Sequence, residues 1–465
     1  MNIFNRKKGM LERKRHIHFV GIGGVGMSAI AQILFRRGYA VSGSDLKANS
    51  LTDRMAALGI TIFTGHARSN ISGADLIVYS SCIPRQNPEI MAARRRGIPL
   101  VARGTMLAEI ARPCASIAIS GAHGKTTTTG MTASICMHAG LDPTVLVGGV
   151  TSFLQDANAH SGSGSLLITE TDESDGSFLE LSPTYPVITN IDLEHMDYYH
   201  DINEIIAAYR RFAQNRRPEG ALIVNSLNEY TGRLLQGLDG PSVSFGLSSE
   251  ADFYPRNLTL MEFGSRFDCV AHGTELGTIE LAVPGIHNVE NALAATAATM
   301  QAGVGFAAVR KGLRLFDGTK RRFEVRYAPD DIMIVEDYAH HPTAIRAIIQ
   351  AAKRLQRRII CVFQPHRYSR TKCLQELFVS CFQGVDYLAV TDIYAASEAP
   401  LEDVSGWSFY KALEKGGYDR LYFFSQERIL DFLECVVRPH DVVLILGAGD
   451  IGEIARKFSA RLAVS

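Results

Sequence analysis

The segment Gly121–Thr129, which reads Gly-Ala-His-Gly-Lys-Thr-Thr-Thr-Thr, has residue types that bind phosphate. It follows the apolar run 116–120, which predicts a buried strand, and it precedes a stretch that predicts the start of a helix. The backbone N–H groups of such a loop and the positive end of the helix dipole face an anion, Lys125 adds a full charge, and the Thr126 hydroxyl can hold Mg²⁺. A loop of this composition can also be a plain turn, but the flanking elements favour a nucleotide site.

The loop is a short form of the P-loop. The longer motif requires a glycine at position 119, where this chain has Ile119, and His123 precedes the second glycine, Gly124. This variant is less typical of GTPases and helicases than of ligases that use ATP.

A second group of candidate residues follows two apolar runs of the middle region. The run 166–169 ends in Glu170-Thr-Asp-Glu-Ser-Asp175, and the run 186–190 is followed by His195. Acidic residues at the carboxyl end of a strand, beside a phosphate loop, are where an α/β sheet offers ligands to the Mg²⁺ of a nucleotide. A neutral imidazole can be a further metal ligand there. We therefore expect Thr126, Glu170 and His195 to hold metal.

A Gly-x-Gly-x-x-Gly turn occurs near each end of the chain. The first, Gly21, Gly23, Gly24 and Gly26, follows a predicted strand, and Asp45 stands where a second strand would end, as in dinucleotide-binding domains. Such a motif alone is weak evidence for NAD, because the chain has another at Gly447–Gly452. We expect the first turn to hold a diphosphate ligand that need not be a nicotinamide, and we interpret the second as helix–strand packing.

Composition limits the class of protein. The 465 residues are 46% hydrophobic and 21% charged with zero net formal charge, which argues against nucleic acid or an anionic membrane as a partner. The eight cysteines are scattered without a Cys-x-x-Cys pair, which fits reduced thiols in the cytoplasm. The uncharged run 16–35 has the length of a membrane span, but four glycines interrupt it, so we expect strand, turn and helix and no membrane insertion.

The elements that must position these residues alternate along the chain. Apolar runs predict strands at 17–20, 76–79, 99–101, 117–120, 166–169, 186–190, 221–224, 332–335, 359–363, 387–391 and 442–446, separated by helical patterns. This alternation is typical of doubly wound parallel sheets. We expect three α/β domains in series at 1–113, 114–317 and 318–465: the first and third Rossmann-like, and the second resembling a P-loop ATPase.

The motifs together resemble the Mur ligase family in order and spacing, over essentially the whole chain. Besides the loop, the acidic strand end and His195-Met-Asp197, the resemblance rests on Gly285–Asn291, Arg321-Arg322-Phe, Asp337-Tyr-Ala-His-His-Pro and Gln364-Pro-His-Arg. Ala122, Thr169, Thr171 and Leu193-Glu194 depart from the usual pattern, but none removes a charge that the chemistry needs. The N-terminal turn and the segment 363–371 are most similar to the branch that adds L-alanine.

The resemblance implies an ATP-dependent ligase of peptidoglycan precursor synthesis. It would join L-alanine to the carboxylate of UDP-N-acetylmuramate through an acyl phosphate, with ATP and Mg²⁺ or Mn²⁺ as cofactors. Other family members carry a carbamylated lysine after the His-Met-Asp segment, whereas residues 192–218 contain no lysine, as expected for the alanine-adding branch. The sequence leaves the oligomeric state open.

The resemblance also implies roles for single residues, in three sets. The expected catalytic residues are Lys125, Glu170, His195, Arg322 and Asp337. The expected ATP-binding residues are Gly121, Ala122, His123, Gly124, Lys125, Thr126, Thr127, Asn288, Asn291, Arg322 and Asp337. The expected substrate-binding residues are Gly21, Gly23, Gly24, Gly26 and Asp45 for the UDP-sugar, with His340, His366, Arg367 and Arg370 for the amino acid or the intermediate.

Three alternatives remain. A recycling ligase of the same family would attach an intact tripeptide to UDP-N-acetylmuramate. An NAD-dependent dehydrogenase would use the turn at Gly21–Gly26 but would leave Lys125, Glu170 and His195 without a role. A non-catalytic nucleotide switch would use the phosphate loop alone.

Overall fold

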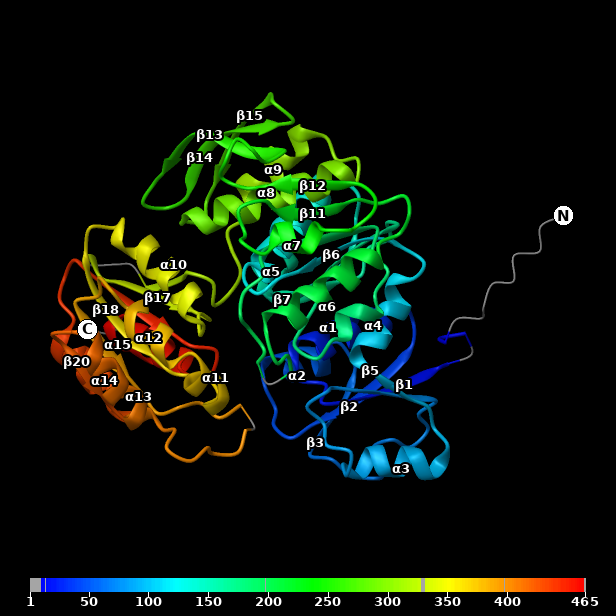
Figure 1. The fold of residues 1–465 in the computed structure, drawn as a ribbon. Helices are drawn as coiled ribbons and strands as arrows, with labels where there is room; N and C mark the ends of the chain where they lie inside the picture. Colours follow the sequence, from blue (N-terminus) through cyan, green and yellow to red (C-terminus); the bar gives the residue numbers. More distant parts are fainter. Residues whose placement is uncertain (1–9, 13, 197, 328–330, 397, 464–465) are drawn as a thin grey trace.

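Three β-sheets follow one another along the chain, each covered by helices (Figure 1). The structure is a computed structural model that describes residues 10–12, 14–196, 198–327, 331–396 and 398–463. The sheets are formed by residues 16–102, 115–281 and 324–446, so each lies within one of the three predicted segments. The exact boundaries of those segments stay a prediction.

The first sheet has five parallel strands in the order β3-β2-β1-β4-β5. This is the doubly wound arrangement expected of a Rossmann-like domain. The strands are β1 His16–Val20, β2 Ala40–Asp45, β3 Thr61–Thr64, β4 Leu76–Tyr79 and β5 Leu100–Ala102, and the helices are α1 Val25–Arg36, α2 Ser50–Ala57, α3 Pro88–Arg96 and α4 Arg103–Ala111.

The second sheet has ten strands in the order β15-β14-β13-β12-β11-β10-β6-β9-β7-β8. Its parallel centre carries the phosphate loop between β6 and α5, while β8 at one edge and the β13–β15 meander at the other are antiparallel. The strands are β6 Ala115–Ser120, β7 Thr144–Thr151, β8 Ala157–His160, β9 Leu166–Glu170, β10 Tyr185–Ile188, β11 Leu222–Asn225, β12 Ser242–Phe245, β13 Phe253–Leu260, β14 Ser265–Ala271 and β15 Thr274–Leu281. The helices are α5 Lys125–His138, α6 Ile202–Gln214, α7 Thr231–Leu235, α8 Ile286–Gln301 and α9 Phe306–Leu315.

The third sheet has six strands in the order β16-β17-β21-β18-β19-β20, parallel except for β16. The strands are β16 Glu324–Tyr327, β17 Met333–Asp337, β18 Arg358–Phe363, β19 Tyr387–Val390, β20 Leu421–Phe423 and β21 Asp441–Leu446. The helices are α10 Pro342–Lys353, α11 Tyr368–Cys373, α12 Gln375–Cys381, α13 Gly406–Leu413, α14 Ile429–Val436 and α15 Gly452–Leu462.

The first two domains share a hydrophobic core, whereas the third has its own. Buried residues of α1 and α4 pack in one apolar cluster with Leu146 and Leu167 of the central sheet. Gln32 Nε2 donates to Asn158 Oδ1 across the same interface at 2.9 Å. The two apolar clusters of the third domain contain only residues from Phe323 onward. Among the described residues, no buried apolar cluster joins the third domain to the other two.

No helix in the described part of the chain is both long enough and apolar enough to cross a membrane. The uncharged run 16–35 forms β1, a turn and most of α1, as its glycines indicated.

Candidate active site

A cavity of about 1580 Å³ lies where the three domains meet. The phosphate loop, the ends of β9 and β10, the linker before β16 and the loops after β17 and β18 all contribute to its lining. Of the predicted site residues, those lining it are Gly26, Ala122, His123, Gly124, Lys125, Thr126, Thr127, Glu170, His195, Asn288, Asn291, Arg322, Asp337, His340, His366, Arg367 and Arg370. Gly21, Gly23, Gly24, Asp45 and Gly121 are not part of the lining.

The phosphate loop has a backbone shape that requires its two glycines. Gly121 has φ 132° and Gly124 has φ 81°, both in the region that side chains rarely adopt. A Cβ on Gly121 would lie 2.1 Å from Thr189 Oγ1, and one on Gly124 would lie 2.3 Å from Asn291 Oδ1. Gly124 then caps α5, so the helix N-terminus opens toward the cavity.

Asn288 and Asn291 of α8 form a hydrogen-bonded pair behind the loop. Asn288 Nδ2 donates to Pro284 O at 2.7 Å, and Asn291 Nδ2 donates to Asn288 Oδ1 at 3.1 Å. Thr128 Oγ1 donates to Asn291 Oδ1 at 3.2 Å. The two amides therefore fix the loop and α5 against α8 at the same time as they line the cavity.

Lys125 lies folded back on its own loop and on an acidic side chain. Its Nζ donates to Gly121 O at 2.5 Å and to Glu173 Oε1 at 2.7 Å. Burial opposes the ammonium charge, but the neighbouring carboxylates, Glu173 foremost, outweigh it and raise the pKa of Lys125. The lysine is thus charged and held at the mouth of the loop, where phosphate oxygens can replace the carboxylate as its partner.

Glu170 and Thr126 form the corner that fits Mg²⁺. Glu170 ends β9, and Thr126 Oγ1 donates to Glu170 Oε1 at 3.2 Å, while Gly148 N donates to Oε2 at 2.8 Å. Burial raises the pKa of Glu170, and Lys125 and Arg322 offset only part of that rise. A divalent cation would stabilise the charged form of this buried carboxylate. Carboxylate and hydroxyl oxygens are also the ligands that Mg²⁺ prefers.

His195 faces Glu173 and Glu194, where we had expected it to share a metal with Glu170. Its Nε2 lies 3.5 Å from Glu173 Oε1 and 4.0 Å from Glu194 Oε2. Burial lowers its pKa, but the hydrogen bond to Glu173 and the carboxylate charges dominate and raise the pKa of His195. A metal ion at this position would displace that proton. Asp197 lies outside the described residues.

The linker before β16 brings arginine to the phosphate loop. Arg322 Nη2 donates to Thr126 Oγ1 at 3.4 Å, and its guanidinium lies 5.1 Å from the ring centroid of Tyr338. Asp337, at the end of β17, accepts from Phe323 N and Ala339 N, each at 2.7 Å. Burial raises the pKa of Asp337 despite these donors. In this arrangement Asp337 shapes the linker that presents Arg322.

Two histidines and two arginines of the third domain line the cavity. His366 Nδ1 lies 3.3 Å from Arg370 Nη1, and its ring lies 5.5 Å from that of His340. Burial and Arg370 hold the pKa of His366 down to about 3, and burial also lowers the pKa of His340. Both rings are therefore neutral beside the positive charges. Arg367, with φ 68°, lies 4.0 Å from Glu398 Oε1.

Direct contacts join the third domain to the central one. Arg370 Nη2 donates to Glu194 Oε2 at 3.1 Å, and Thr343 Oγ1 donates to Asp192 Oδ2 at 2.9 Å. The rings of His123 and His341 lie 4.9 Å apart. These contacts between the two domains are formed by polar side chains.

The N-terminal glycine turn is closed on itself by Asp45. Gly23 N donates to Asp45 Oδ2 at 2.8 Å, and Gly21 N donates to Ser44 O at 2.8 Å. The turn lies beside the part of the cavity that the first domain lines, where Gly26 and Arg103 contribute to the wall. Asp45 is thus engaged by the turn itself, which disfavours the ribose-binding role that a dehydrogenase would give it.

The second glycine turn packs against the linker. Arg321 Nη2 donates to Gly447 O at 2.7 Å and to Gly449 O at 2.9 Å. A Cβ on Gly452 would lie 2.1 Å from Glu336 Oε1. These contacts agree with packing between strand, helix and linker, although Gly449 and Gly452 also line the cavity.

Several lining residues were missing from the predicted set: Arg103, Asp192, Glu194 and His341. Glu173, which pairs with Lys125, was missing as well. Glu173 and Glu194 lie in motifs that the sequence singles out, but nothing in the spacing tells which acid faces the loop. Arg103 is the first residue of α4, and only the fold brings it within 3.8 Å of Asp172 and 3.7 Å of Asp175.

Comparison with known proteins agrees with this architecture. Family models match residues 16–113 as Mur ligase family, catalytic domain, residues 119–299 as Mur ligase middle domain, and residues 321–449 as Mur ligase, glutamate ligase domain. Two UDP-N-acetylmuramate–L-alanine ligases are similar over nearly their full length. That of Pelotomaculum thermopropionicum is 43% identical, with 97% of this chain and 98% of the relative covered, and that of Geotalea uraniireducens is 44% identical, with 96% and 98% covered.

Solved structures show the same arrangement of three domains. The crystal structure of the UDP-N-acetylmuramate–alanine ligase of Thermotoga maritima matches with a TM-score of 0.82 and 31% identity, covering 97% of this chain and 99% of that one. A murein peptide ligase of Psychrobacter arcticus, 23% identical with a TM-score of 0.72, covering 96% of this chain and 98% of that one, shares the fold. The chain belongs to the Mur ligase family.

Proposed function

We propose that this protein joins L-alanine to the carboxylate of UDP-N-acetylmuramate at the expense of ATP, in the synthesis of peptidoglycan precursors. The proposal rests mainly on one observation: a phosphate loop, an acidic strand end and arginines of the third domain line the same cavity. The relatives that match over 96–97% of the chain bear the name of this activity.

The reaction needs activation because a carboxylate does not accept an amine at neutral pH. In the first step a carboxylate oxygen attacks the γ-phosphorus of ATP, which forms an acyl phosphate and releases ADP. In the second step the alanine amine attacks the acyl carbon, and phosphate leaves with the oxygen it took. Both steps bring anions together, so the protein contributes chiefly positioning and positive charge.

The central domain supplies the charge for phosphoryl transfer. Lys125, which pairs with Glu173 in this structure, would bind the β- and γ-phosphates, and the N–H groups of residues 121–127 would surround them. Arg322 Nη2, 3.4 Å from Thr126 Oγ1, would reach the same phosphates from the linker. Mg²⁺ held by Thr126 and Glu170 would neutralise charge on the transferred group, and His195 with Glu173 would serve a second ion.

The third domain completes the site for the amino acid. Arg370 and Arg367 would bind the alanine carboxylate, and the neutral imidazoles of His340 and His366 beside them would add no further positive charge next to the amine, which enters the reaction after it has lost its proton to solvent. Arg370 bonds to Glu194 of the central domain in this structure, so the amino-acid site is assembled only when the two domains dock. Docking excludes the water that would hydrolyse the acyl phosphate.

The UDP moiety is assigned to the first domain, with its diphosphate at the turn Gly21–Gly26 and its sugar directed along Gly26 and Arg103 into the cavity. We assign the reaction to the cytoplasm, where ATP is available. The eight cysteines, all within the described residues, form no disulfide, in keeping with a reducing compartment.

An acceptor panel tests this proposal against its nearest rival. Phosphate release is measured with ATP, Mg²⁺ and UDP-N-acetylmuramate, adding L-alanine, glycine, L-serine or an intact tripeptide, and the products are identified by mass spectrometry. We expect L-alanine to give the highest kcat/KM. A preference for the tripeptide would assign the chain to recycling instead, and no product with any acceptor would refute the ligase.

A further inference from the structure

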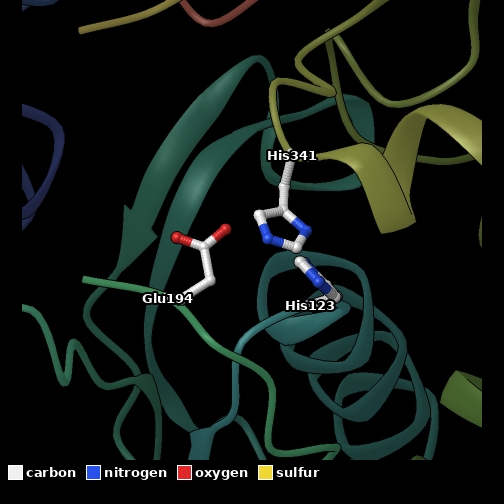
Figure 2. A group of neighbouring side chains, drawn as sticks. All are labelled: His123, Glu194 and His341. Atoms are coloured by element: carbon white, nitrogen blue, oxygen red, sulfur yellow. The ribbon is translucent and has the colours of Figure 1, made fainter. Parts of the chain in front are cut away.

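Three side chains that the proposed reaction does not use as metal ligands meet at the boundary between the central and third domains. They are His123, Glu194 and His341, and Figure 2 shows both rings and the carboxylate turned toward one another. One ring nitrogen of each histidine and one carboxylate oxygen all lie within 4.8 Å of one another.

The three residues come from separate elements that the fold brings together. His123 belongs to the phosphate loop, Glu194 follows β10 in the chain, and His341 is the N-cap of α10 in the third domain. His123 and Glu194 therefore belong to the central domain, whereas His341 belongs to the third domain, which has its own apolar core.

His341 has an unused nitrogen in a buried position. Only 2% of the residue is exposed, and its Nε2 has no hydrogen-bond partner among the described residues. A buried polar atom left in this way is costly unless something binds it. Its Nδ1 accepts a long bond from Thr343 N at 3.3 Å and also lies 3.8 Å from Asp192 Oδ2.

Asp192 is placed to orient the imidazole of His123, because its Oδ2 lies 3.0 Å from His123 Nε2. A proton on that nitrogen leaves Nδ1 of His123 with a lone pair for a metal. For Nε2 of His341 to bind a metal, the ring proton must lie on Nδ1, which then gives up the long bond from Thr343 N. Asp192 Oδ2, now 3.8 Å from that Nδ1, would become its acceptor when the site contracts. A carboxylate behind a histidine is the usual second partner of metal-binding imidazoles.

The charges also suit a cation. Burial lowers the pKa of His341 to about 4, so its ring is neutral at neutral pH and has no proton to lose on binding. Arg370 Nη2 approaches Glu194 at Oε2, which leaves Oε1 for a ligand role. Asp192 and Glu194 together supply two negative charges, and the positive charges that face Glu194 are Arg370 and His195, whose Nε2 lies 4.0 Å from Glu194 Oε2.

We propose that His123, Glu194 and His341 bind a divalent transition metal ion of the Zn²⁺ class, which clamps the third domain onto the central one. Two imidazoles and one carboxylate are a donor set for Zn²⁺ rather than for Mg²⁺, which prefers oxygen. Tetrahedral Zn²⁺ with ligands at about 2.0–2.1 Å needs ligand atoms roughly 3.3 Å apart. The group must therefore contract, and the interface between two domains can supply that movement. The proposed site shares no residue with the corner formed by Thr126 and Glu170, although both line the same cavity.

Zn²⁺ binding to the full chain tests the proposal. The metal-free protein is titrated with Zn²⁺ in a millimolar excess of Mg²⁺, with a chromophoric chelator as competitor, and Co²⁺ is used as a probe of tetrahedral geometry by its visible absorption. We expect one tight equivalent. His341→Ala and Glu194→Gln should each weaken it by more than about 100-fold, because loss of an orienting partner alone costs 10–100-fold. Asp192→Asn should weaken it by about 10-fold or more.

Matched variants separate this site from others. His200→Ala removes an exposed histidine that pairs with Glu204 in the same domain, and it should leave the tight equivalent unchanged. His195→Ala should also retain it. Loss of the tight equivalent in His195→Ala with retention in His341→Ala would assign Zn²⁺ to the catalytic metal site and overturn the proposal.

Small-angle scattering tests the clamp itself. One equivalent of Zn²⁺ should lower the radius of gyration of the ligand-free wild type but not of His341→Ala. Absence of tight Zn²⁺ binding, or tight binding without compaction, would contradict the clamp. Neither readout uses turnover, so the result is independent of the proposed ligase activity. If circular dichroism shows that His341→Ala does not fold, Glu194→Gln replaces it in the comparison with the wild type.

Discussion

Lys125→Ala should remove turnover and also destabilise the protein, through two separate effects. The lysine is a cation placed for the transferred phosphoryl group, and a cation in such a position is worth about 10³–10⁵ in rate. We therefore expect kcat to fall at least about 10³-fold. UDP-N-acetylmuramate binding should change little, because the glycine turn that is expected to hold its diphosphate belongs to the first domain.

The stability effect follows from Glu173. Its side chain is 3% exposed and receives Lys125 Nζ at 2.7 Å, so removal of the lysine leaves a buried carboxylate that retains His195 as a weaker partner at 3.5 Å. Breaking a buried pair costs about 3–5 kcal/mol, and we expect the lower end because Lys125 is itself 15% exposed. Lys125→Ala/Glu173→Gln removes both charges and should recover most of that loss without recovering turnover.

Urea unfolding, phosphate release and calorimetric titration with UDP-N-acetylmuramate measure the three quantities. Turnover of Lys125→Ala near that of the wild type would refute the role of the loop. Equal free energies of unfolding for the single and double variants would refute the buried pair as the source of the destabilisation.

Three further predictions concern the other parts of the site. Gly23→Val should weaken UDP-N-acetylmuramate binding but leave ATP binding intact. The reason is that a Cβ at position 23 would lie 2.9 Å from Asp45 Oδ2, so the glycine turn would have to change shape. Equal loss of both ligands in a folded variant would argue against separate sites. Arg370→Ala removes the bond to Glu194 and should leave a larger radius of gyration when ATP and UDP-sugar are bound. In the wild type those ligands, at saturation, should shrink the radius, and an unchanged radius would contradict domain closure. Burial holds the pKa of His287 down to about 4, against 6.5 in the unfolded chain, so the unfolded state binds more protons between these two pH values. The free energy of unfolding should therefore fall as the pH drops from 6.5 to 4. Urea unfolding should show a shallower fall for His287→Gln.

Much of the fold follows from local pattern. Each predicted apolar run overlaps a strand, because parallel strands buried on both faces are continuous apolar segments. The β13–β15 meander was not predicted. Its strands mix polar with apolar residues, as in Phe253–Leu260, and the buried apolar stretch of β14, 269–271, is only three residues long, so no long apolar run marks the meander. The core shared by α1 and the central sheet was also beyond sequence reasoning, because it joins residues more than a hundred positions apart.

The candidate site was predictable where one motif makes one local structure. The loop at Gly121–Thr129 is such a case, since its glycines, lysine and threonine act within one turn. Partner choice was not predictable. Glu170 and Glu173 lie three residues apart, yet the end of β9 turns one toward Thr126 and the other toward Lys125. The sequence motif led us to predict His340 and not its neighbour His341 as a site residue. Only the position of the third domain in the structure shows that His341 lies beside His123.

Transfer of oxygen from the substrate to phosphate tests the central claim most directly. UDP-N-acetylmuramate labelled with ¹⁸O in both carboxylate oxygens is incubated with the enzyme, ATP, Mg²⁺ and L-alanine, and the phosphate and the product are analysed by mass spectrometry. Attack of the carboxylate on the γ-phosphorus predicts one ¹⁸O in each phosphate released and one in the new amide. Unlabelled phosphate, or phosphate release without an alanine adduct, would contradict the account.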